Sequence, residues 1–147
     1  RKLFFTTFIF LIALFLLFPG VSLAIDISAT GGWSEIIDAN DLVSGAGSDL
    51  KSSYESEAGA TLLTISGCVD DNDTWQVEVS RIDYNWPFTL WVKTSGGEYQ
   101  AITASNSLLF SGAGNTSIPL QYKLEGMSVQ ISPATYSTTI TYTVVDT

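Results

Sequence analysis

Alternation of apolar and polar residues with a period of two constrains the fold of this chain more than any other feature. It is clearest over residues 74–81, TWQVEVSR, where Trp75, Val77 and Val79 fall on one side. Successive side chains of a β-strand point to opposite faces, whereas a helix repeats its apolar residues every three or four positions. The segment therefore predicts a half-buried strand.

Similar segments recur along the chain, separated by turn-forming residues. They lie at residues 25–28, 61–66, 88–94, 116–126, 127–132 and 136–147. Because Pro119 cannot donate to a ladder, we expect its strand at a sheet edge or beside a bulge. Residues 38–57 are the least regular part and predict a long loop or one helical turn. Seven to nine short strands are typical of an all-β sandwich or barrel.

The N-terminal residues have the layout of a secretory signal peptide. A short basic start is followed by an apolar run over residues 3–18, a Pro-Gly break and small residues that end at Ala24. This order predicts a signal peptide over residues 1–24 and one domain over residues 25–147. The alternative is a retained membrane or pilin-type helix, for which about 20 apolar residues are usual. Cleavage predicts a secreted or cell-surface protein without a membrane segment.

Charge excludes one class of partner. The chain has fifteen acidic and six basic residues, a formal charge of −9. After cleavage four basic residues would face fifteen acidic ones, which gives −11; the four are Lys51, Arg81, Lys93 and Lys123. Such a surface repels nucleic acid and anionic lipid. The sequence therefore predicts no binding to DNA or RNA.

The sequence offers no visible catalytic equipment. Histidine is absent, which removes Ser-His-Asp and Cys-His catalysis and the common zinc sites. None of the fifteen acids has a context that singles it out as half of a carboxylate pair. We therefore predict a non-enzymatic protein that needs no cofactor.

Clustered acids at residues 68–75, CVDDNDTW, leave a calcium site as an alternative. Its ligands would be Asp70, Asp71 and Asp73, since calcium prefers clustered oxygen atoms. The EF-hand pattern fails here, however, and Asp and Asn are ordinary turn formers between strands. A turn is the favoured interpretation.

Cys68 is the only cysteine, so an intrachain disulfide is not possible. Between Gly67 and Val69 it is interpreted as a small, buried apolar residue. An intermolecular disulfide is the alternative.

Exposed aromatic residues are the candidates for ligand binding. Trp86 precedes Pro87, and Tyr99 follows a Gly-Gly turn. Trp91 and Leu90 point to opposite faces of the same strand, so Trp91 lies on the face that Leu90 avoids. Such rings stack on sugars, although packing is the commoner use of aromatic side chains. These three residues predict a carbohydrate- or ligand-binding module as the alternative function.

The C-terminal segment SVQISPATYSTTITYTVVDT resembles the end of spore coat protein U-type and related pilin-like secreted β-domains. Those domains commonly close with a Pro/Gly-x-Tyr turn and a Thr/Val-rich strand, here Pro133 to Tyr136 and then Thr138 to Val144. The resemblance implies an immunoglobulin-like antiparallel sandwich, export, and surface fibres assembled by strand donation. The usual cysteine pair is missing, and the N-terminal donor strand would be short.

Together these features predict a structural or adhesive protein of the cell surface or extracellular space. Its partner would be a second copy or another surface protein, paired through a strand, with a glycan as the alternative. A sheet edge left open is a template for strand addition. The residues expected to pair are Ile25, Ile27 and Ala29 near the N-terminus and Tyr136, Ile140, Tyr142 and Val144 near the C-terminus.

Overall fold

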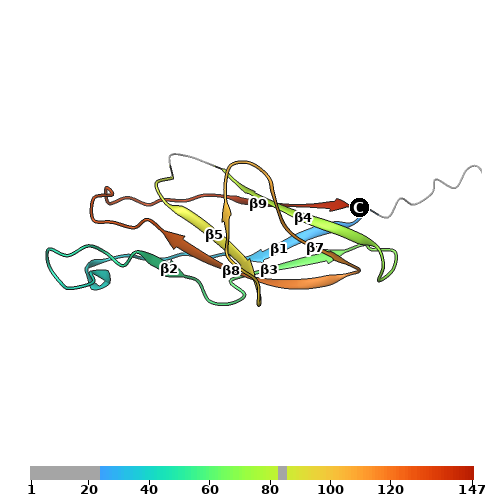
Figure 1. Cartoon of the computed structure of the whole chain (residues 1–147), viewed down its shortest axis with the longest axis horizontal. Helices are drawn as coiled ribbons and strands as arrows, with labels where there is room; N and C mark the ends of the chain where they lie inside the picture. Colours follow the sequence, from blue (N-terminus) through green and yellow to red (C-terminus); the bar gives the residue numbers. More distant parts are fainter. Residues whose placement is uncertain (1–23, 83–85) are drawn as a thin grey trace, which may run out of the picture.

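The computed structural model describes residues 24–82 and 86–147, which form two antiparallel β-sheets (Figure 1). The strands are β1 (Asp26–Gly31), β2 (Ser53–Glu55), β3 (Thr61–Ser66), β4 (Thr74–Arg81), β5 (Thr89–Thr94), β6 (Gln100–Ile102), β7 (Ser107–Ala113), β8 (Thr116–Glu125) and β9 (Ile140–Asp146). The all-β prediction is confirmed. Apart from Ala24, the predicted signal peptide lies outside the described residues.

The two sheets differ in size and exchange strands along the chain. The larger has the order β1-β3-β8-β5-β6, with β2 also paired to β8, and the smaller has the order β7-β4-β9. The chain crosses between the sheets from β3 to β4, from β4 to β5, from β6 to β7, from β7 to β8 and from β8 to β9. These crossings hold the sheets face to face.

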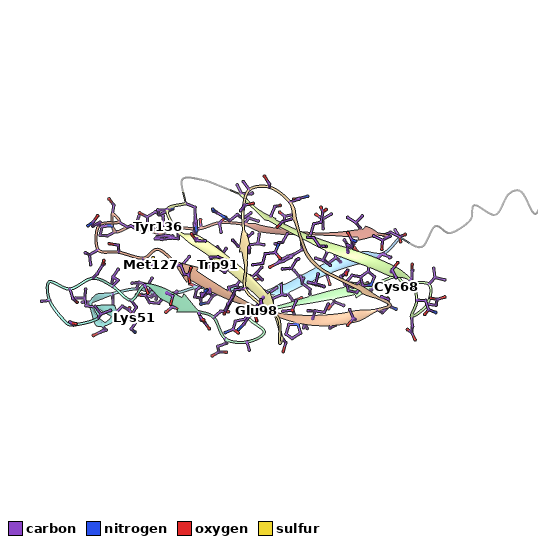
Figure 2. The ribbon with its side chains drawn as sticks, in the orientation of Figure 1. Lys51, Cys68, Trp91, Glu98, Met127 and Tyr136 are labelled. Atoms are coloured by element: carbon purple, nitrogen blue, oxygen red, sulfur yellow. The ribbon has the colours of Figure 1, made fainter. Side chains whose placement is uncertain are left out.

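The core lies between the sheets and comes from the predicted inward positions (Figure 2). From the smaller sheet, Trp75 is 1% exposed, and Val77 and Val79 are fully buried. The larger sheet contributes Leu63, Ile65, Leu90, Val92, Leu120, Tyr122 and Leu124. Period-two alternation thus assigned the buried face of β3, β4, β5 and β8 correctly.

The expected place of Pro119 at a sheet edge or bulge is wrong. Its strand, β8, is the central strand of the larger sheet, between β3 and β5. The ladder between β5 and β8 ends at the pair Thr94–Leu120, and Leu120 directly follows Pro119 in the chain. On the other side, Pro119 faces Leu62 of β3. The proline therefore sits where β5 has already ended, so its missing N–H leaves no gap in the ladder.

Two expectations near the C-terminus are also wrong. Residues 127–132 form no strand but a turn, in which Ile131 donates its N–H to the carbonyl of Ser128 at 3.0 Å. The last strand begins at Ile140, so Tyr136 lies before it. Tyr136 instead packs edge-on against Phe88, with ring centroids 5.0 Å apart. Burial of this ring against the core overrides the local alternation.

The irregular region over residues 38–57 contains the helical turn considered from the sequence. It is a 3-10 turn, η1 (Ala39–Asp41), with Asp38 as its N-cap. The same region reaches the loop after β8, because the carboxylate of Asp49 accepts hydrogen bonds from Ser128 Oγ and Val129 N. Both loops lie at the same end of the molecule (Figure 1).

Candidate functional site: an open strand edge

β9 is an edge strand with one unpaired side. It pairs with β4, and within the described residues no strand lies on its other side. Thr147 donates its N–H to the carbonyl of Thr74 at 3.1 Å, which assigns the odd-numbered residues of β9 to the ladder with β4. Hydrogen-bonded pairs alternate along an antiparallel ladder. The backbone groups of Ile140, Tyr142 and Val144 therefore point away from β4, toward the open edge.

β1 is the corresponding edge of the larger sheet. Gly32 donates its N–H to the carbonyl of Ala60 at 2.8 Å, so the even-numbered residues of β1 bond to β3. The backbone groups of Ile27 and Ala29 point to the unpaired side by the same alternation, and Ile25 directly precedes the strand. Five of the seven residues predicted to pair thus belong to the two edge strands, whereas Ile25 and Tyr136 lie just outside them.

The two edges are not equally open. Asp26 turns its carboxylate onto its own strand and accepts the N–H of Ile27 at 2.9 Å. A charged residue that occupies a free backbone donor is one way in which proteins blunt a sheet edge. On β9 the corresponding groups of Ile140, Tyr142 and Val144 have no such cover among the described residues. β9 is therefore the better acceptor for an added strand.

β1 and β9 lie beside one another, and the core is incompletely covered where they meet. Their inward side chains pack against the core but stay half-buried; these are Ile25, Ile27, Ile140, Tyr142 and Val144. Further inside the smaller sheet, the side chains of β4 are buried. An added strand would bury the apolar surface that β1 and β9 leave exposed.

The opposite side of the sandwich is bridged. The chain passes there from β6 to β7, and the side chain of Gln100 donates to the carbonyl of Leu108 at 2.8 Å. Arg81 at the end of β4 also reaches β6, with Nε donating to the carbonyl of Ile102 at 2.9 Å. These contacts occupy polar groups that an edge would otherwise present. The open side is the one formed by β1 and β9.

A hydroxyl network fastens β9 to the larger sheet. The hydroxyls of Tyr142 and Tyr122 share a hydrogen bond of 2.8 Å, and Tyr122 donates to Oγ1 of Thr61 at 2.8 Å. Burial and the neighbouring Tyr122 raise the pKa of Tyr142 well above its ordinary value. Because this network holds the inner face of β9, an added strand would meet a fixed edge.

The three aromatic candidates are divided between two places. Trp86 lies against the core, edge-on to Phe88 with ring centroids 5.3 Å apart. Trp91 lies on the outer face of β5, as the alternation predicts, and Tyr99 lies near it. Lys123 lies over both rings, with Nζ 5.1 Å from the Trp91 centroid and 4.7 Å from the Tyr99 centroid. Trp91 and Tyr99 therefore share one surface, and Trp86 is not part of it.

The acidic loop uses its carboxylates as turn caps. Asp70 accepts the N–H of Asn72 at 2.7 Å, and Asp73 accepts the N–H of Val69 at 2.8 Å. Among the described residues no group of three acidic, cysteine or histidine side chains is placed to hold a metal ion. The observed contacts of Asp70 and Asp73 are those of the turn interpretation, and Asp71 lies in the same turn, beside Gly114.

Cys68 is half-buried against the core at the end of β3. Burial, with a smaller effect of Asp73, raises the pKa of its thiol. Since the thiolate is the reactive form, we expect the folded protein to react with Ellman's reagent at pH 8 at least about tenfold more slowly than the urea-unfolded chain. Equal rates would show that the thiol is freely accessible and would favour the intermolecular disulfide instead.

Comparisons with protein-family models, with curated proteins and with solved structures each found no match. In the part of the chain that the structure describes, no helix is long and apolar enough to cross a membrane. The candidate site therefore rests on the geometry of the chain itself.

Sequence reasoning missed the residues around the two rings. Lys93 and Lys123 were noted only for their charge, and Glu55 and Gln121 were not singled out. Alternation could have placed Lys93 beside Trp91 on the outer face of β5, two residues along the strand. Nothing in the sequence indicates that β8 brings Lys123 opposite Trp91.

Proposed function

We propose that this chain is a non-enzymatic structural or adhesive protein of the cell surface or extracellular space that associates by pairing a strand with β9. The observation that carries this proposal is the open edge of β9. There the backbone groups of Ile140, Tyr142 and Val144 point away from β4, and the core beside them is only half covered. Backbone hydrogen bonds would supply affinity, and alternate side chains of the added strand would supply specificity.

We further infer that the sandwich is immunoglobulin-like. In that fold one sheet has the strand order A-B-E-D and the other sheet has the strand order C-F-G. The order β1-β3-β8-β5 corresponds to A-B-E-D, and the pair β4-β9 corresponds to C-F. In the described residues no strand occupies the G position, which lies on the open side of β9. The proposed added strand would pair at this position.

The apolar pattern indicates what kind of strand would fit. Ile140, Tyr142 and Val144 point inward and stay half-buried, so the added strand would present apolar side chains at alternate positions. The neighbouring edge supplies such a segment at the start of β1, with Ile27 in the strand and Ile25 directly before it. A second copy of the chain is therefore the partner that we propose to test first.

A proline on the open edge tests the proposal. Residues 25–147 should form concentration-dependent oligomers, and Val144→Pro should make them at least about tenfold less stable, because proline removes an N–H that faces the partner but not β4. The measurement is size-exclusion chromatography with light scattering.

Val144→Thr is the matched control, because it keeps the N–H and should still associate. Circular dichroism of both variants would verify that they fold. A wild-type protein that stays monomeric at millimolar concentration would contradict self-association. Pairing with another surface protein would then be tested by capture with the folded domain, using Val144→Pro as the control.

A further inference from the structure

We propose that the outer face of the larger sheet carries a binding site for an uncharged saccharide, formed by Trp91 and Tyr99 with Lys93, Glu55 and Gln121. The site lies on a different sheet from the open edge of β9, so neither proposal depends on the other. Its residues come from β2, β5 and β8 and from the loop that precedes β6.

Strand register brings these residues together. The ladder between β5 and β8 sets Trp91 opposite Lys123 and Lys93 opposite Gln121. The ladder between β2 and β8 sets Glu55 opposite Lys123. On its other side Trp91 faces Ala101 of β6, which has a small side chain. The result is one polar and aromatic surface across four strands.

The two rings carry polar hydrogens that are poorly satisfied. Nε1 of Trp91 is buried and has no hydrogen-bond partner in the described part of the chain, and the buried hydroxyl of Tyr99 has only the nearby carboxylate of Glu55 as a possible acceptor. Buried polar groups normally find partners, so these two groups on one surface need an explanation. Burial and the nearby Glu55 carboxylate raise the pKa of Tyr99 to about 12, so its phenol stays a donor near neutral pH. A ligand rich in hydroxyl oxygens would supply the missing acceptors.

Lysine side chains cover the faces of the Trp91 and Tyr99 rings. Nζ of Lys93 lies 4.4 Å from the centroid of Tyr99, and Nζ of Lys123 lies near both rings. Aromatic faces are electronegative and attract positive groups. The C–H groups of a sugar ring carry partial positive charge and would take the same positions once the lysine side chains swing aside. The ammonium group of Lys93 could then bind sugar hydroxyls.

The local charges favour an uncharged ligand. Lys93 and Lys123 are balanced by Glu55 and by Glu125, whose carboxylate lies 2.7 Å from Nζ of Lys123. A carboxylate accepts hydrogen bonds and an ammonium donates them, and hydroxyl groups need partners of both kinds. An anionic polysaccharide would in addition be repelled by the formal charge of −9 on the whole chain. We therefore infer a neutral sugar rather than a uronic or sulfated one.

Affinity electrophoresis of the full chain in gels that contain soluble polysaccharides tests this site. The panel is xylan, mannan, glucan and hydroxyethyl cellulose as neutral probes, with polygalacturonate and heparin as charged ones. We expect at least one neutral probe to retard the protein, and Trp91→Ala and Tyr99→Ala each to weaken that retardation at least tenfold. Retardation should be unchanged in 0.5 M NaCl.

Trp86→Phe is the matched control, because Trp86 lies outside the surface and phenylalanine keeps its packing. Circular dichroism of each variant separates lost binding from lost folding. The proposal is overturned if no neutral probe retards the folded protein, or if the double variant Trp91→Ala/Tyr99→Ala is retarded as the wild type is. Salt-sensitive retardation by the charged probes alone would also overturn it, in favour of an electrostatic site.

Discussion

Replacing Trp75 by alanine is expected to lower the free energy of unfolding by about 3–5 kcal/mol, the usual range for a buried large aromatic residue. The indole is 1% exposed and packs edge-on against Phe110, with centroids 5.9 Å apart. Its Nε1 donates to the carbonyl of Gly114 at 2.9 Å. Gly112 opposes the ring so closely that a Cβ there would lie 2.5 Å from it. Truncation would therefore leave both a cavity and an unpaired carbonyl.

Urea unfolding followed by circular dichroism measures this effect. Trp91→Ala is the matched control: because its ring lies on the outer face of β5, we expect a loss of at most about 1 kcal/mol. Equal losses in the two variants would mean that the alternation does not separate core from surface. The control also shows whether the Trp91 variant is folded enough for the saccharide experiment.

Alkaline pH should destabilise the protein through its buried tyrosines. The folded pKa of Tyr142 is raised well above the unfolded value of about 10. Its contribution is therefore fully present below about pH 10 and decreases as the pH rises further, because the unfolded chain loses a proton that the folded chain keeps. Above pH 10 this one group lowers the free energy of unfolding by about 1.4 kcal/mol per pH unit. Tyr99, with a pKa of about 12, acts in the same direction.

Urea unfolding between pH 8 and pH 11.5 tests this expectation. Tyr142→Phe removes the titrating hydroxyl and should flatten the decrease above pH 10, while Tyr122 keeps its hydrogen bond to Thr61. Tyr136→Phe is the matched control, because the Tyr136 hydroxyl donates to the carbonyl of Ser132 in an exposed loop. A decrease that is as steep in Tyr142→Phe as in the wild type would contradict this role of Tyr142.

Local pattern predicted the strands and their buried faces where the alternation was long. Residues 61–66 and 74–81 match β3 and β4 at both ends, and Trp91 lies on the face expected for it. The prediction failed where the pattern was short or diluted. Residues 127–132 alternate but form a turn, whereas β7, which contains Ser107, Ser111 and Gly112, was not recognised. Short alternation does not distinguish a strand from a loop that buries two side chains.

The candidate sites were predictable in part. Ile140, Tyr142 and Val144 lie in β9, which is an edge strand among the described residues; that they pair with a partner stays a prediction. The sequence did not reveal that Asp26 blunts β1, whereas the outer backbone groups of β9 have no such cover from the residues that the structure describes. Nor did it separate Trp86 from Trp91 and Tyr99, because the distance between aromatic rings depends on strand register. Register joins residues that are far apart in the chain.

The sequence by itself determined the long strands β3, β4, β5 and β8 and which of their side chains avoid water, because a period of two is a local property of the backbone. Only the tertiary structure decided which strands are neighbours. It placed Pro119 in a central strand at the point where β5 ends, and it set Lys123 over the rings of Trp91 and Tyr99. It also left one side of β9 without a partner strand among the described residues. Strand order results from the joint packing of two sheets around one core, and no local segment contains that information.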